Sequence, residues 1–296
     1  MKNKKTRSGI VALVGPPNVG KSTLLNGLLG QKISIVSHRP QTTRNRIAGI
    51  ITGDDYQIVI IDTPGIHEAR SPLNLEMVKV ACDSLSEVDL ILFMTDVTLA
   101  PDSASQEKSA SLVRESRHPT ILILNKIDLI EREKLLPLIK RFGAIDNFAE
   151  IIPVSAKKGD GLDLLRREVV ARLPEGPMLY PADIPTDASE RFIVGEIIRE
   201  KVFLRTSQEI PYSTAVLIDD FHEGKNKVTI QATIVVAKPS QKGIVIGKGG
   251  QCLKDIGIGA RKEIETLLGK RVNLKLWVKV KKDWSRDPRF MRELGF

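Results

Sequence analysis

The segment GPPNVGKS, residues 15–22, has the composition and spacing of a phosphate-binding loop. It stands between an apolar run, Ile10–Val14, and a helix-like run, Lys21–Leu29. Glycines at this spacing let backbone N–H groups point at phosphate oxygens, and the N-terminus of the following helix favours anions. In this pattern Lys21 reaches the β- and γ-phosphates, and the Ser22 hydroxyl binds Mg²⁺. The sequence therefore predicts a triphosphate and Mg²⁺ site formed by Gly15, Pro16, Pro17, Asn18, Val19, Gly20, Lys21, Ser22 and Thr23.

Two later segments indicate which base is bound. The segment NKID, residues 125–128, follows the apolar run Thr120–Leu124, at the end of a strand where ligands bind in such folds. A carboxylate at Asp128 can accept hydrogen bonds from both N1–H and the 2-amino group of guanine. Adenine lacks this donor pair and would leave the carboxylate unpaired. With the segment SAK, which can offer a backbone N–H to guanine O6, the sequence predicts GTP or GDP bound by Asn125, Lys126, Asp128, Ser155, Ala156 and Lys157.

A third segment, DTPG at residues 62–65, ends the strand-like run Tyr56–Ile61. We expect Asp62 near Mg²⁺, in its second shell, and the Gly65 N–H near the γ-phosphate. Ras-like and Gα GTPases orient the attacking water with a glutamine. Here Ile66 follows Gly65, and an isoleucine can neither accept a proton nor orient water. Slow intrinsic hydrolysis is therefore predicted. We also expect a switch segment that GTP and Mg²⁺ order, formed by Asp62, Thr63, Pro64, Gly65 and Ile66.

Basic residues are concentrated at the end of the chain. Residues 238–296 contain 15 basic and 6 acidic side chains. Their net charge of +9 equals that of the whole chain. Such an excess is typical of a surface that binds a polyanion. A solvated basic face and an anionic membrane surface are the alternatives.

The loop GKGG, residues 247–250, lies in this basic part and has the GxxG pattern. It follows apolar residues, precedes a helix, and stands in the order helix, strand, strand, helices, strand. In this context it resembles a KH domain of the prokaryotic type II, in which glycines let a single strand approach and aliphatic walls hold its bases. We expect RNA contacts from Ile244, Ile246, Gly247, Lys248, Gly249, Gly250, Leu253, Ile256, Lys270 and Arg271.

The elements that position these motifs fall into two domains. The chain has 296 residues, enough for two cores, and residues 9–173 alternate apolar strands with amphipathic helices. This alternation predicts an α/β domain with a mostly parallel sheet and helices on both faces. We expect a basic tail at 1–8, a semi-rigid proline-rich linker at 174–187 and an α+β domain at 188–296.

The remaining composition excludes several classes of protein. The two cysteines, Cys82 and Cys252, are far apart and form no disulfide framework or zinc motif. No apolar run approaches the roughly 18 residues needed to cross a bilayer. We expect a cytoplasmic monomer.

The order of the motifs in residues 9–173 resembles that of translation-factor-type GTPases. This resemblance implies a first switch at Gln41, Thr42, Thr43, Arg44 and Asn45. In GTPases of this type, one threonine of the first switch binds Mg²⁺ when the γ-phosphate is present. We favour Thr43 as this ligand, and Thr42 is the alternative. Asn18 resembles the asparagine that holds a monovalent cation in some relatives, which implies a role for K⁺.

The layout of a GTPase domain, a proline-containing linker and a KH domain resembles the Era family of bacterial GTPases over essentially the whole chain. This resemblance implies binding of the single-stranded 3′ end of small-subunit ribosomal RNA and a role in small-subunit assembly. It also implies peripheral membrane association. The alternatives are a GTP-gated RNA-binding module with incidental hydrolysis and a membrane-surface regulatory GTPase.

Overall fold

The structure is a computed structural model, and two compact units are resolved in it, one ending at Asp187 and the other beginning at Ala188. Ile35 and Val36 belong to the second unit although they lie early in the chain. Among the residues that it describes, no helix is long and apolar enough to cross a membrane. The described residues are 6–36, 43–65, 77, 79–80, 82–85, 87–99, 103–144, 146–206, 210 and 213–294.

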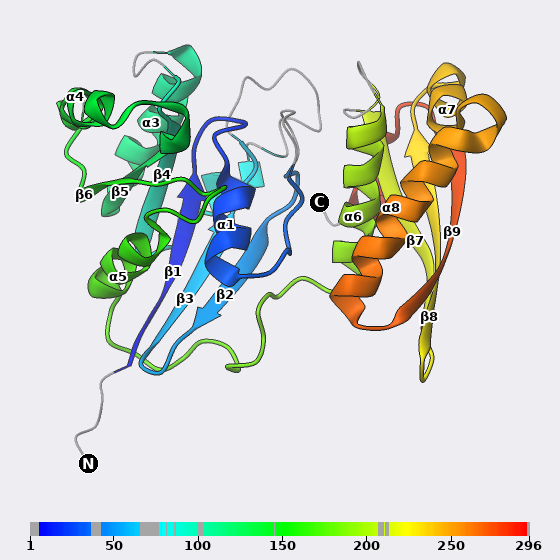
Figure 1. Ribbon diagram of the computed structural model, residues 1–296, viewed down its shortest axis with the longest axis horizontal. Helices are drawn as coiled ribbons and strands as arrows, with labels where there is room; N and C mark the ends of the chain where they lie inside the picture. Colours follow the sequence, from blue (N-terminus) through cyan, green and yellow to red (C-terminus); the bar gives the residue numbers. More distant parts are fainter. Residues whose placement is uncertain are drawn as a thin grey trace. The chain divides into compact units, whose positions relative to one another are not determined.

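The first unit contains a six-stranded sheet in the order β2-β3-β1-β4-β5-β6 (Figure 1). All neighbouring strands are parallel except β2 and β3. Central strands such as β4 and β5 are buried along their whole length, which explains their continuous apolar sequences. The strands are β1 (Arg7–Val14), β2 (Ile47–Thr52), β3 (Tyr56–Asp62), β4 (Leu90–Asp96), β5 (Thr120–Asn125) and β6 (Glu150–Pro153).

Helices cover both faces of this sheet. Side chains alternate along a strand, so Ala12 and Val14 of β1 point to one face, where Val113 and Phe142 of two helices join their core cluster. On the other face, two helices pack on β3 and on each other. The first pair is α3 (Ala104–Ser116) and α4 (Arg132–Gly143), and the second is α1 (Lys21–Leu29) and α5 (Leu162–Arg172), with a short helix η1 (Ile127–Leu129) after β5.

The edge strand β2 was not predicted from the sequence. It contains Gly49, a residue that is unfavourable in strands. A Cβ at Gly49 would lie 2.6 Å from Cδ1 of Leu25 in α1, so the glycine allows the helix to pack closely on the strand. Tertiary packing therefore outweighs local propensity here.

The proline-rich segment 174–187 is bonded to the first unit along its length, which corrects the expectation of a separate linker. The Gln57 side chain, fully buried, bonds to the backbone of Leu179 and Tyr180. The N–H of Ile50 donates to the Pro185 carbonyl at 2.8 Å, and thereby covers the open edge of β2.

The expected N-terminal tail is also shorter than predicted, because β1 begins at Arg7. The Arg7 guanidinium donates to the carbonyls of Ala171 and Leu173, and the Ser8 N–H donates to that of Pro174. These bonds join the start of the sheet to the end of α5.

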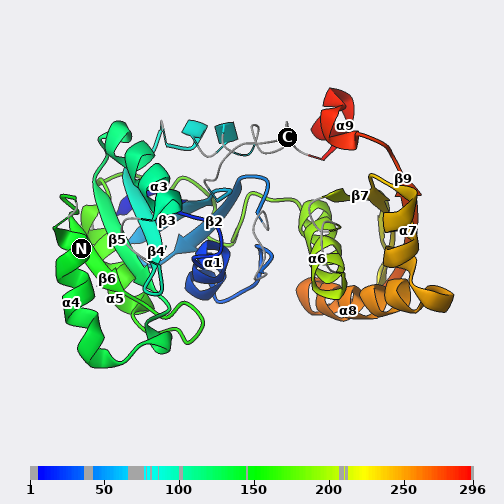
Figure 2. The ribbon, with the colours of Figure 1, turned by 90° about the horizontal axis from the view of Figure 1, so that it is seen from above.

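The second unit has the predicted order of helix, strand, strand, helices and strand. Its sheet has the order β7-β8-β9, with β7 antiparallel and β9 parallel to β8. Two long helices, α6 and α8, lie against one face of it (Figures 1 and 2). The elements are α6 (Glu190–Arg205), β7 (Thr214–Glu223), β8 (Lys227–Val236), α7 (Pro239–Ile246), η3 (Lys248–Gly250), α8 (Gln251–Leu268), β9 (Arg271–Val280), η4 (Trp284–Arg286) and α9 (Pro288–Glu293).

The core of this unit is aliphatic and repeats with helical spacing. In α8 the buried residues Ile256, Ala260 and Ile264 are four positions apart and face the sheet. Trp284 is a packing residue: its ring is buried against Phe290 of α9, a helix that was not predicted from the sequence.

We predict that Ile256→Ala lowers the free energy of unfolding of the second unit by about 2–5 kcal/mol, because it leaves a cavity in the core. The matched change Ile258→Ala, at a side chain that is 39% exposed, should cost less than about 1 kcal/mol. Both tryptophans of the chain lie in the second unit, so denaturation followed by tryptophan fluorescence measures this unit. Equal losses in the two variants would contradict this view of the core.

Candidate nucleotide site and nucleic-acid interface

The phosphate-binding loop connects the end of β1 to the start of α1, as predicted. Gly20 has φ 105°, and a Cβ there would lie 2.4 Å from Nδ2 of Asn125, so only glycine fits. Asn18 also has a positive φ of 64° and its side chain is exposed. Val19 is buried, and Thr23 lies in the first turn of α1.

Lys21 is buried beneath this loop. Its Nζ donates to the carbonyls of Gly15 and Pro16, at 2.9 Å each. Burial lowers the pKa of Lys21 to about 8, although the nearby Asp62 carboxylate acts in the opposite direction. A phosphate beside this amine would favour its charged form, which is the electrostatic basis for anion binding here.

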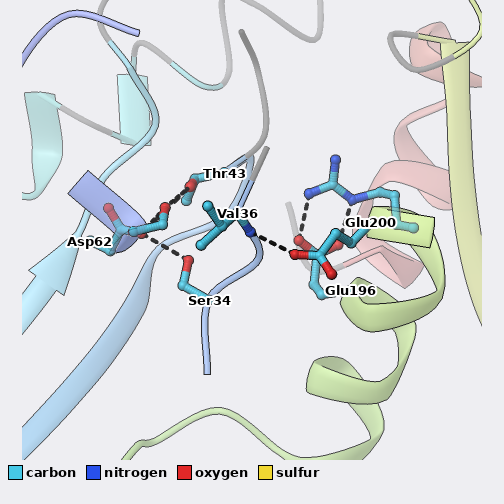
Figure 3. Close-up of polar contacts among 8 residues, drawn as sticks. Ser34, Val36, Thr43, Asp62, Glu196 and Glu200 are labelled. Carbon is cyan, nitrogen blue, oxygen red and sulfur yellow. Dashed lines mark hydrogen bonds and ion pairs between the residues drawn. The ribbon is translucent and has the colours of Figure 1, made fainter. Parts of the chain in front are cut away.

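Asp62, at the end of β3, is the centre of a buried hydroxyl cluster (Figure 3). Its Oδ2 accepts hydrogen bonds from Ser22 at 2.8 Å and Ser34 at 2.9 Å, and Thr43 lies at 3.5 Å. Ser22 and Thr43 also share a hydrogen bond of 2.8 Å. Burial raises the pKa of Asp62, and Lys21 and the three hydroxyls oppose this.

The cluster fits Mg²⁺. Oδ1 of Asp62 is buried and accepts no hydrogen bond from any described residue, which leaves a carboxylate oxygen available. The described residues hold no group of three or more His, Cys, Asp or Glu side chains that could form a protein cage for a metal. Mg²⁺ is typically bound by one or two carboxylates, waters and substrate phosphates, so Ser22, Thr43 and Asp62 form a suitable set.

The structure brings Thr43 to this cluster, whereas Gln41, Thr42 and Ile66 lie outside the described residues. Arg44 is buried, and Asn45 is partly buried. Ser34 was missed by the sequence analysis. It lies in a loop after α1 with no motif spacing, and only the fold places its hydroxyl beside Asp62.

The predicted second switch begins at Asp62, the last residue of β3. The Thr63 hydroxyl donates to the Leu13 carbonyl at 2.8 Å, and Pro64 follows. A Cβ at Gly65 would lie 2.9 Å from Cα of Pro17, so this glycine allows the switch to approach the phosphate-binding loop.

The predicted guanine residues come together at the ends of β5 and β6. The buried Asn125 side chain donates to the Val19 carbonyl at 2.7 Å and accepts from the Ala156 N–H at 2.9 Å. It thus joins the phosphate-binding loop to the base-binding segment.

Asp128 is oriented for the base by its neighbour. Its Oδ1 accepts a hydrogen bond from the Ser155 hydroxyl at 2.7 Å, and this bond is the main cause of its lowered pKa. Asp128 therefore stays an acceptor, as pairing with N1–H and the 2-amino group of guanine requires. Lys126 forms an ion pair with Asp96, and Lys157 is exposed.

The GxxG loop lies between α7 and α8. Gly247 has φ 74°, and a Cβ there would lie 2.7 Å from Cβ of Cys252, so glycine is required. Lys248 and Gly249 are exposed, and Gly250 caps the start of α8. Backbone N–H groups at this helix start can meet a phosphate.

The structure corrects part of the predicted RNA surface. Ile244 is 50% exposed, but Ile246 and Leu253 pack partly against the core, and Ile256 is fully buried in it. Helix α8 has 18 residues, about 27 Å. It separates the GxxG loop from Lys270 and Arg271, and Lys270 forms an ion pair with Glu223.

Two models of known protein families match this chain, one in the N-terminal part and one in the C-terminal part. A family model described as "50S ribosome-binding GTPase" matches residues 10–126. A second, described as "KH domain", matches residues 209–285.

Similar proteins match along the whole chain. The GTPase Era of Geobacter sp. (strain M21) is 52% identical, covering 100% of both chains. That of Syntrophus aciditrophicus is 50% identical, covering 98% of this chain and 95% of the relative.

Two solved structures are similar over 98% of this chain and 99% of theirs, each with 43% identity and a TM-score of 0.94. One is Aquifex aeolicus Era bound to GDP·AlF4⁻, and the other is Era in complex with MgGDPNP and nucleotides 1506–1542 of 16S ribosomal RNA. These similarities extend over the nucleotide site and the GxxG loop alike, and the chain belongs to the Era family of GTPases, with a GTPase domain followed by a KH domain.

Proposed function

We propose that this chain is a GTP-hydrolysing switch that binds the single-stranded 3′ end of small-subunit ribosomal RNA and acts in maturation of that subunit. The observation that carries the proposal is the meeting of Lys21, Ser22, Asp62 and Asp128 at one edge of the sheet. A relative that is 43% identical binds MgGDPNP and nucleotides of 16S ribosomal RNA. That match favours the small subunit over the large subunit named in the description of the GTPase family.

In this mechanism the chain's own residues bind and orient the nucleotide. Lys21 supplies charge to the β- and γ-phosphates, and the glycines of the loop allow backbone N–H donors to approach. Ser22 and Thr43 would bind Mg²⁺, with Asp62 behind them, and Asp128 selects guanine. When bound, Mg²⁺ neutralises the charge that develops on the phosphates.

Hydrolysis is expected to be slow because Ile66 offers no polar group to orient water. Asn18 is exposed in the loop, where its side-chain oxygen could bind K⁺ and supply the charge that an arginine finger supplies elsewhere. RNA binding and the GTP state would favour each other, since coupling between two binding sites is reciprocal.

We predict that Asp128→Asn weakens GTP binding by about 10–100-fold, because the side chain loses a charge-assisted acceptor and gains a donor that meets the 2-amino group. Xanthosine triphosphate, with a carbonyl at that position, should bind the variant better than GTP does. Titration of the wild type and the variant with both nucleotides measures this. Unchanged GTP affinity would remove Asp128 from the base site.

We predict that GTP turnover is faster in potassium than in sodium buffer at equal ionic strength, and that Asn18→Ala abolishes the difference. Turnover is measured as phosphate release at saturating GTP and Mg²⁺. Equal rates of the wild type in the two buffers would refute a K⁺ site.

We predict that Lys248→Asp weakens binding of a single-stranded 16S 3′-end oligonucleotide about tenfold and lowers the salt dependence by about one phosphate contact. The control is Arg271→Asp, which makes the same charge change at the other end of α8 and should have less than about a threefold effect. Equal effects would indicate a diffuse basic surface. Competition by anionic vesicles against the oligonucleotide would favour the membrane alternative.

A further inference from the structure

The backbone N–H of Val36 donates a 2.8 Å hydrogen bond to Oε1 of Glu200 (Figure 3). Both residues belong to the second compact unit, although 164 positions separate them in the chain. Glu200 lies on α6 and is only 2% exposed. A buried carboxylate that accepts a backbone N–H makes a charge-assisted bond, which is stronger than a bond between neutral groups.

The rest of the Glu200 carboxylate is engaged within the second unit. Its Oε2 pairs with Nζ of Lys201 at 2.8 Å, and the same Nζ pairs with Glu263 of α8. Burial alone lowers the pKa of Lys201, but the hydrogen bonds to the two carboxylates raise it overall, so the amine stays charged. Glu200 is therefore held in place as an acceptor by the packing of α6 on α8.

The segment before Val36 is fixed to the nucleotide site. The Ser34 hydroxyl donates to Oδ2 of Asp62 at 2.9 Å. The Asn26 side chain accepts from the N–H groups of Ile33 and Ser34 and donates to the Ser34 carbonyl. Only Ile35 separates Ser34 from Val36, and two residues span at most about 7 Å.

We propose that Glu200 is a positioning residue that anchors residues 35–36 and makes this anchor sensitive to the nucleotide. Ser34 shares Oδ2 of Asp62 with Ser22 and Thr43, the residues suited to Mg²⁺. A cation near this oxygen weakens it as an acceptor for Ser34, and a shift of Ser34 is passed through one residue to Val36. The inference rests on the proposed function, because it assigns that function's coupling between nucleotide and RNA to a named contact.

The contact itself can be tested without RNA and without turnover. In the full-length chain labelled with ¹⁵N-valine, hydrogen exchange of the Val36 amide is measured by NMR. Glu200→Met removes the acceptor at similar volume and should speed exchange about 10–100-fold. Glu200→Gln keeps an acceptor oxygen and should restore most of the protection.

Glu263→Gln is the matched control. It weakens the pair with Lys201 but leaves the Glu200 carboxylate beside Val36, so Val36 exchange should change less than about threefold. Tryptophan fluorescence shows whether each variant keeps the second unit folded. Unchanged Val36 exchange in a folded Glu200→Met variant would overturn the anchor.

Two measurements test whether the anchor at Val36 depends on the bound nucleotide. In the wild type, Val36 exchange should differ between the GDP form and the form bound to Mg²⁺ and a non-hydrolysable GTP analogue. The ratio of RNA Kd values in these forms, typically about 5–150-fold for coupled sites, should fall towards 1 in Glu200→Met and be retained in Glu200→Gln and Glu263→Gln.

The outcomes separate the two proposals. If the wild-type RNA affinity depends on the nucleotide and Glu200→Met keeps the full ratio, the role of Glu200 is overturned while the proposed function stands. If the wild type shows no dependence on the nucleotide in RNA affinity or in Val36 exchange, both the coupling and the anchor are overturned.

Discussion

One buried carboxylate, that of Asp62, organises the nucleotide site. Its burial makes the charge costly unless polar groups surround it, and the hydroxyls of Ser22, Ser34 and Thr43 meet this need from three separate segments of the chain. Because these partners come from the start of α1, the segment before residue 37 and the segment before β2, their positions depend on one another. A change in what Asp62 binds therefore affects the hydrogen bonds of all three hydroxyls.

The parallel sheet explains why distant motifs form one site. The strands β1, β3, β5 and β6 run in one direction, so the segments that follow them emerge at the same edge. Asn125 then joins two of these segments by bonding to Val19 and Ala156. In the second unit, a single long helix positions the site. Helix α8 starts directly after the GxxG loop, and its apolar side packs against the sheet.

Much of this architecture could be predicted from the sequence, because the phosphate-binding loop and the segments that begin at Asp62, Asn125 and Ser155 are short and each follows a strand. Residues that act through tertiary contacts could not be predicted. Ser34 has no motif, the role of Gly49 appears only when α1 packs on β2, and Ile256 is indistinguishable from a groove residue until α8 is placed on the sheet. Lys270 and Arg271 belong to the same basic stretch of sequence as the GxxG loop, but in the structure the length of helix α8 separates them from that loop.

The bonding of the proline-rich segment has a mechanical consequence. Asp187 is fixed to the first unit, since its carboxylate accepts from the Ala48 N–H, and the next residue, Ala188, already packs against the core of the second unit. Because residues 174–187 are bonded to β2 and β3, they cannot extend as a spacer unless those hydrogen bonds break. A flexible segment of the same length would instead sample a wide range of end-to-end distances.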